Sequence, residues 1–162
     1  MRERDEFAFG EGSESRLITV TDYLQMTARR VIKSSRIDIS VPYLGGRRNC
    51  EEQNDAFNRN ASKADGIIKK SRHQILDKYG KAKALDLVAY IKGFGLSYES
   101  LGRAGMIGAM MLEAWEELQD EGLIPKDLYL HWGGFWNNEK DDELGWDPWH
   151  FEERDYPQVI RI

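Results

Sequence analysis

The 162-residue chain has one cysteine, three histidines and no long apolar run. Because Cys50 has no second cysteine to pair with, an internal disulfide is excluded and the fold must depend on packing, with or without a metal. No window is long enough to cross a bilayer, and the charged first residues lead into no apolar segment. We therefore expect synthesis in a reducing cytoplasm, without a signal peptide and without stable membrane insertion.

An excess of basic residues is also missing. Lys and Arg together number 23 against 28 Asp and Glu, which gives a net charge of -5. A protein that grips phosphates needs a positive face to displace counterions, so the sequence predicts no nucleic-acid partner. Hydrophobic residues make up 41% and charged residues 31%, which are ordinary values for a globular protein with one core.

Helical and strand patterns alternate along the chain without an internal repeat, which predicts an α+β fold. The charged, Gly- and Ser-containing residues 1–16 predict a flexible N-terminal arm, followed by a single domain over residues 17–162. Helices are expected from Thr19 or Thr21 to about residue 34, and over residues 51–60 and 98–122. Strands are expected over residues 37–41, 84–91 and 128–132.

The most unusual stretches are residues 130–136 and 146–152, which together hold four of the five tryptophans, a glycine pair, an aspartate and two histidines. We interpret His150 as a metal ligand and Asp147 as the acid or base beside it. Residues three apart on a straight strand face opposite ways, so the two share a site only if the chain bends between them. Pro148 favours such a bend. The alternatives are a core histidine and a proline turn with a solvated carboxylate.

With only three histidines, a metal site has few possible compositions. A catalytic zinc takes about three nitrogen or carboxylate ligands and keeps one position open. His73, Asp86 and His150 meet that count, whereas His131 is expected to have a structural or cleft-lining role. Asp86 lies in the apolar run 84–91, where a buried charge is costly without a partner or a cation.

Several segments carry a family resemblance because of their order. They are Gly46 to Gln53, Ser71-Arg72-His73, Ala84 to Tyr90, Trp132-Gly133-Gly134 and Asp147 to Glu152. This order resembles the D-alanyl-D-alanine carboxypeptidase family of zinc peptidases, and within it most closely the phage L-alanyl-D-glutamate peptidase endolysins. The likeness covers roughly residues 20 to 155.

The resemblance implies a small antiparallel sheet that carries the site, flanked by helices, as in hedgehog and D-Ala-D-Ala peptidases. It implies a Zn²⁺ ion held by His73, Asp86 and His150. Asp147 matches the catalytic carboxylate, Arg48 matches the arginine near the scissile carbonyl, and Ser71 lies where a hydroxyl contacts the substrate. Zinc activates water and polarises a carbonyl, and a nearby carboxylate transfers the proton.

The implied function is hydrolysis of the L-alanyl-D-glutamate bond in the peptidoglycan stem peptide by a monomeric phage endolysin. Such an enzyme would act in the periplasm and cell wall after the host membrane is permeabilised. One alternative is a D-alanyl-D-alanine carboxypeptidase. The other is a non-catalytic protein with a structural zinc site.

One feature departs from the family pattern. Twelve residues separate His73 from Asp86, whereas the family usually has six between these ligands. A longer hairpin between neighbouring strands would change little, because the cost of loop closure rises slowly with length. If the two ligands must share a tight turn, Asp77 is the substitute ligand.

Overall fold

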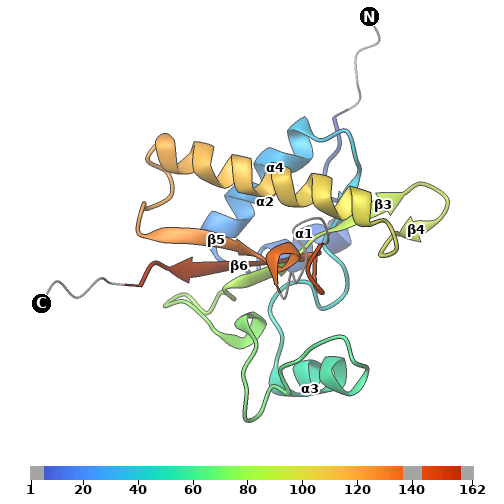
Figure 1. Cartoon of the computed structure of the whole chain (residues 1–162), viewed down its shortest axis with the longest axis vertical. Coiled ribbons are helices and arrows are strands. Elements are labelled where there is room, and N and C mark those ends of the chain that lie inside the picture. The colour runs from blue at the N-terminus through green and yellow to red at the C-terminus, as the bar shows by residue number, and fades with distance from the viewer. Residues whose placement is uncertain (1–5, 137–143, 158–162) are drawn as a thin grey trace, which may run out of the picture.

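The computed structural model describes residues 6–136 and 144–157, in which helices lie on two sides of a small β region (Figure 1). The helices are α1 (Glu11–Leu17), α2 (Asp22–Ser34), α3 (Cys50–Asn58) and α4 (Leu101–Asp120), with the 3-10 helices η1 (Arg72–Gln74) and η2 (Gly133–Phe135). The strands are β1 (Ile39–Ser40), β2 (Ala84–Asp86), β3 (Val88–Ile91), β4 (Gly95–Leu96), β5 (Leu128–Trp132) and β6 (His150–Asp155). The expected α+β class is confirmed.

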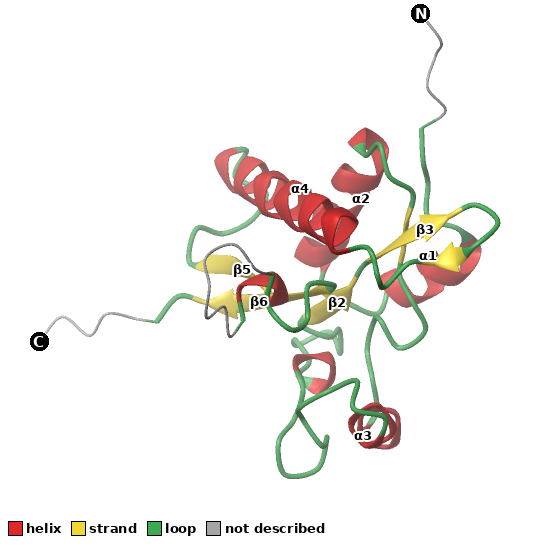
Figure 2. Ribbon diagram, turned by 45° about the vertical axis from the view of Figure 1, so that its right-hand side comes forward, coloured by secondary structure: helices red, strands yellow, loops and turns green. Residues whose placement is uncertain are grey.

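The strands form two antiparallel sheets, with orders β1-β3-β4 and β2-β6-β5 (Figure 2). The apolar run 84–91, expected as one strand, divides at Leu87. The Leu87 N–H donates to the Trp149 carbonyl at 2.9 Å, and the chain passes there from β2 to β3. The run therefore supplies one strand to each sheet.

The β2-β6-β5 sheet has a core face and a polar face. Alternate residues of β5 are buried toward the core: Leu128, Leu130 and Trp132. Directly paired residues of antiparallel strands share a face. The register pairs Asp86 with His150 and His131 with Glu152, which places these four side chains together on the polar face.

Helices α2 and α4 pack against each other above the sheet, and α3 lies on the other side (Figures 1 and 2). Helix α2 begins after Thr21, as expected, but the Thr21 hydroxyl donates to the Glu153 carboxylate at 2.7 Å instead of capping the helix. Gly108 of α4 is needed for close packing, because a Cβ there would lie 2.3 Å from the Trp132 ring. Within the described residues, no helix is both long enough and apolar enough to span a bilayer.

The end of the expected N-terminal arm is helical. Residues 11–17 form α1 with Ser13 and Leu17 buried, so the end of the expected arm packs on the core. Leu17 is the one bulky apolar residue of this helix, and it is fully buried in the core. Cys50, the first residue of α3, is exposed. A single domain over residues 17–162 stays a prediction.

Candidate metal centre

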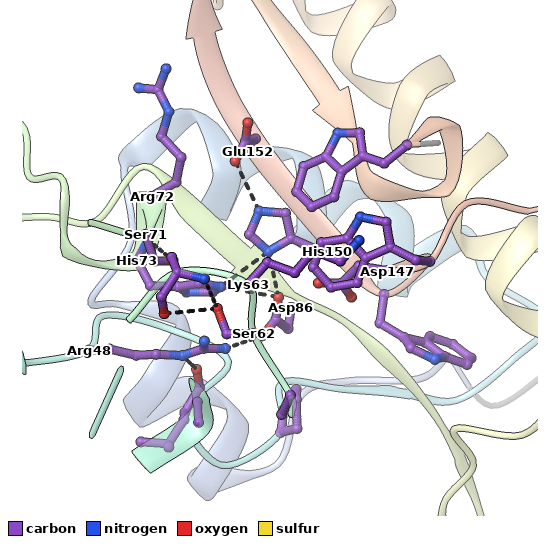
Figure 3. A pocket seen from close by; sticks show the side chains of 18 of the residues that line it. Arg48, Ser62, Lys63, Ser71, Arg72, His73, Asp86, Asp147, His150 and Glu152 are labelled. Carbon is purple, nitrogen blue, oxygen red and sulfur yellow. Dashed lines mark hydrogen bonds and ion pairs between the residues drawn. The ribbon is translucent and has the colours of Figure 1, made fainter. Parts of the chain in front are cut away.

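Three ligand-type side chains from distant parts of the chain meet on the polar face of the sheet (Figure 3). His73 comes from η1, Asp86 ends β2 and His150 begins β6. His73 Nε2 lies 3.2 Å from Asp86 Oδ1 and 3.2 Å from His150 Nδ1. His150 Nδ1 lies 3.0 Å from Asp86 Oδ1. The three atoms form a nearly equilateral triangle.

A triangle of this size and chemistry fits one divalent metal ion. Ligands that bind zinc tetrahedrally at 2.0–2.1 Å lie about 3.3 Å from each other. Two imidazole nitrogens and one carboxylate oxygen are also a donor set of catalytic zinc sites, which leave a position for water or substrate. Within residues 6–136 and 144–157, this is the group of His, Cys, Asp and Glu side chains that is arranged to hold a metal.

The long interval between His73 and Asp86 forms a separate turn. The Asp77 carboxylate accepts the N–H groups of Tyr79 at 2.8 Å and Lys81 at 2.9 Å, so it closes this turn and is not a substitute ligand. The extra residues therefore form this turn and displace neither His73 nor Asp86. Ser71 caps η1, and its hydroxyl accepts the His73 N–H at 3.3 Å beside the pocket.

Hydrogen bonds orient both imidazole rings. His73 Nδ1 lies 2.6 Å from the Gly46 carbonyl, which only accepts, so this nitrogen is the donor and Nε2 has its lone pair free. His150 Nε2 lies 3.1 Å from Glu152 Oε2, and Arg154 binds the other oxygen of Glu152. A carboxylate behind a ligating histidine fixes the ring and makes it a stronger ligand. Our sequence reasoning assigned no role to Glu152 or Arg154.

Replacing Glu152 by Gln is expected to weaken metal binding about 10- to 100-fold, because His150 loses its anionic partner. Competition with a chromophoric chelator measures this affinity. Glu153→Gln is the matched control, since Glu153 is also buried but binds Thr21 on the other side of the sheet. An unchanged affinity in Glu152→Gln would contradict the assigned role.

Arg48 binds and orients the Asp86 carboxylate. Its Nη2 donates to Asp86 Oδ2 at 2.6 Å, while Nη1 donates to Gln53 Oε1 at 3.1 Å and Nε donates to the Leu44 carbonyl at 2.6 Å. Burial opposes the ionisation of Asp86, but the charges of His73 and Arg48 hold the pKa of Asp86 well below its usual range. Asp86 is therefore an anion.

The two histidines differ in basicity. Burial lowers the pKa of His73, which favours the neutral ring that a metal needs. Burial also acts against the charged form of His150, but its hydrogen bonds to Asp86 and Glu152 raise its pKa to about 9. A metal ion that enters at neutral pH must therefore displace a proton from His150.

Asp147 enters the same pocket from the turn before β6. The His150 N–H donates to the Asp147 main-chain oxygen at 3.2 Å, so the chain bends at Pro148 as the sequence predicts. A Cβ at Gly133 would lie 2.1 Å from that oxygen, so only glycine permits this approach. Figure 3 shows the Asp147 side chain beside His150 and Asp86. Burial and then the charge of Asp86 raise the pKa of Asp147 to about 7.

The centre opens into a pocket of about 1020 Å³ with aromatic and basic walls. Trp136 lies 5.0 Å from His150 and 5.7 Å from His131 between ring centroids, and Trp146 continues this wall. His131 lines the pocket but does not belong to the triangle. Burial lowers the pKa of His131. A cleft of this size is at the upper end of the range for ligand-binding pockets.

Comparison with known proteins agrees with the fold and the centre. The chain is similar to the crystal structure of Serratia marcescens L-Ala D-Glu endopeptidase ChiX, with a TM-score of 0.59 and 24% identity over 93% of this chain and 92% of that chain. A family model described as phage L-alanyl-D-glutamate peptidase matches residues 5–152. No curated protein sequence matches.

The family match defines a hydrolase of the peptidase class, and in this α+β domain His73, Asp86, Asp147 and His150 line one pocket. The chain belongs to the phage L-alanyl-D-glutamate peptidase family, because the family model covers most of its length. It is a peptidase that acts on peptidoglycan, as the sequence predicted.

Proposed function

We propose that His73 Nε2, Asp86 Oδ1 and His150 Nδ1 hold a catalytic Zn²⁺ ion. The observation that carries this proposal is the triangle of these atoms, with edges of 3.0–3.2 Å and both rings oriented by hydrogen bonds. Zinc supplies Lewis acidity, which makes water a nucleophile near neutral pH and polarises a carbonyl. The pocket beside the triangle leaves room for both reactants.

Asp147 is the proposed general base and acid. Its carboxylate takes a proton from the attacking water, and the resulting carboxylic acid gives the proton to the amine nitrogen that leaves. A group that performs both transfers works best with a pKa near the working pH; burial raises the pKa of Asp147 to about 7, and a bound cation lowers it from there. Its burial also limits proton exchange with bulk water.

Arg48 and Ser71 are proposed to act on the substrate side. Each Nη atom of Arg48 keeps a second N–H beyond its bond to Asp86 or Gln53, and these can donate to the oxygen of the scissile carbonyl. The Ser71 hydroxyl lines the pocket and can donate to the substrate backbone. Arg48 also fixes Asp86, so its replacement affects the metal as well as the reaction.

The preferred substrate bond is the L-alanyl-D-glutamate bond, since the matching family is described by this activity. A D-alanyl-D-alanine carboxypeptidase is the alternative within the class. A purely structural zinc is less favoured, because structural sites are usually closed by four protein ligands, whereas three cluster here beside a pocket in the described chain.

We further propose that the protein acts as a monomeric endolysin on the stem peptide in the cell wall, once the host membrane is permeabilised. The test is incubation of zinc-loaded protein with purified sacculi, followed by mass spectrometry of the released muropeptides. New amino termini on D-Glu support the proposal. Release of D-Ala supports the carboxypeptidase, and no release by protein that retains zinc contradicts both.

Zinc affinity is expected to depend on pH through His150. Its raised pKa of about 9 means that the ring is protonated at neutral pH, and binding must displace that proton. The apparent affinity should therefore rise about tenfold for each pH unit between pH 7 and pH 9. Competition titrations across this range measure the slope, and a flat profile would contradict the assignment of His150 as a ligand.

A further inference from the structure

Lys63 brings a positive charge into the metal pocket. Its ammonium lies 4.5 Å from the centroid of the Trp146 ring, so the side chain extends from the loop after α3 to the aromatic wall. Lys63 lines the same pocket as His73, Asp86 and His150, and Figure 3 labels these residues. Within the described part of the chain, no carboxylate forms an ion pair with Lys63. An ammonium held on an aromatic face remains able to bind an anion.

The other cations near the centre are engaged or directed elsewhere. Arg48 binds Asp86, Arg154 binds Glu152 and Arg59 lies 3.2 Å from Asp55. Arg72 points away from the metal ligands (Figure 3). Lys63, Lys69 and Lys70 are all exposed at the pocket, and of these three Lys63 is the one whose ammonium is held over an aromatic ring. Lys63 is therefore the cation best placed to meet a substrate anion beside the triangle.

The loop that carries Lys63 is tied to the metal centre by Gln53. This side chain is fully buried, and its Nε2 donates to Ser62 Oγ at 2.8 Å and to the Ala64 carbonyl at 2.8 Å. Its Oε1 accepts from Arg48, which binds the ligand Asp86. Ser62 and Ala64, on either side of Lys63, are thus connected to Asp86 through the side chains of Gln53 and Arg48. These hydrogen bonds fix the main chain at Lys63 relative to the reacting bond.

The substrate supplies the matching anion. When D-Glu is linked onward through its side-chain carboxyl, its α-carboxylate stays free on the carbon bonded to the scissile nitrogen. A carboxylate so close to the cleaved bond must enter the pocket, where burial is costly unless a cation pairs with it. We propose that the Lys63 ammonium binds this α-carboxylate and so determines specificity on the leaving side of the bond, an inference that rests on the proposed function.

The test compares two stem peptides that differ only in the α-carboxylate of D-Glu, which is free in one and amidated in the other. The wild-type protein should cleave the free form with a kcat/KM about 10- to 100-fold higher, the usual effect of a hydrogen bond to a charged group. Lys63→Met should cleave the free form only as fast as the amide, whereas Lys63→Arg should keep the preference.

Lys78→Met is the matched control. Lys78 also lies over an aromatic ring, 5.0 Å from the centroid of Tyr79, but it is not among the residues that line the pocket. This variant loses the same charge and should retain the wild-type preference. Zinc content of each variant shows that the centre is intact.

Equal cleavage of the two peptides by the wild-type protein would overturn the role of Lys63 and leave the peptidase function standing. An undiminished preference in Lys63→Met would do the same. If zinc-loaded wild-type protein cleaves neither these peptides nor sacculi, the proposed function itself fails.

Discussion

Replacing Asp147 by Asn is expected to lower kcat/KM for stem-peptide cleavage about 10²- to 10⁴-fold while zinc remains bound. The amide has the same shape but cannot take and return a proton. The main-chain oxygen of Asp147 still accepts from His150, so the turn before β6 stays in place. Steady-state kinetics on a defined muropeptide, with metal analysis of the same sample, measures both quantities.

The pH profile separates this role from a structural one. The carboxylate form of Asp147 is the base, so wild-type activity should fall as pH drops through its pKa. In the metal-free protein the pKa of Asp147 is about 7. A bound cation lowers this pKa, because the cation favours the ionised carboxylate. The residual activity of Asp147→Asn should lack this acid limb. Full activity in Asp147→Asn would refute the assignment.

Replacing Asp86 by Asn is expected to reduce zinc content from one ion per chain to nearly none after dialysis, with a loss of activity greater than about 100-fold. The change removes the single anionic ligand of the triangle. The amide oxygen can still accept from Arg48, which keeps the fold intact. Metal analysis and circular dichroism of the dialysed protein measure the two effects.

Asp77→Asn is the control for this experiment, because Asp77 is the carboxylate that the long His73 to Asp86 interval suggested as an alternative ligand. The structure places Asp77 in a turn, where it accepts main-chain N–H groups. This variant should keep its zinc. Retention of zinc by Asp86→Asn, together with its loss from Asp77→Asn, would reverse the ligand assignment.

The sequence was sufficient to predict the fold class, the family and the grouping of His73, Asp86 and His150. Few histidines, one carboxylate in an apolar run and a proline after Asp147 each restrict where a site can form. The helix after Thr21 and the strand 128–132 follow from apolar periodicity alone. The catalytic roles of Arg48, Ser71 and Asp147 stay predictions.

Other features depend on contacts between distant residues, which no local pattern records. Glu152 binds His150 because both side chains lie on the same face of β6. Residues two apart share a face only if the segment is a strand, and the local sequence does not establish that. In the sequence, Gln53 is an ordinary polar residue of a helix. In the fold, its side chain is covered by the loop that contains Ser62 and donates to the Ser62 hydroxyl. The division of residues 84–91 between two sheets likewise depends on the partner strands, β6 and β1.

Zinc-edge X-ray absorption of the wild-type protein, loaded with one zinc ion per chain, tests the central claim most directly. We predict a first shell of nitrogen and oxygen at about 2.0–2.1 Å, with the multiple-scattering signature of two imidazoles. This signature should fall to one imidazole or vanish in His150→Ala. Two results would contradict the site described here. One is a sulfur ligand at about 2.3 Å, which would have to come from Cys50, the one cysteine of the chain. The other is a shell without imidazole.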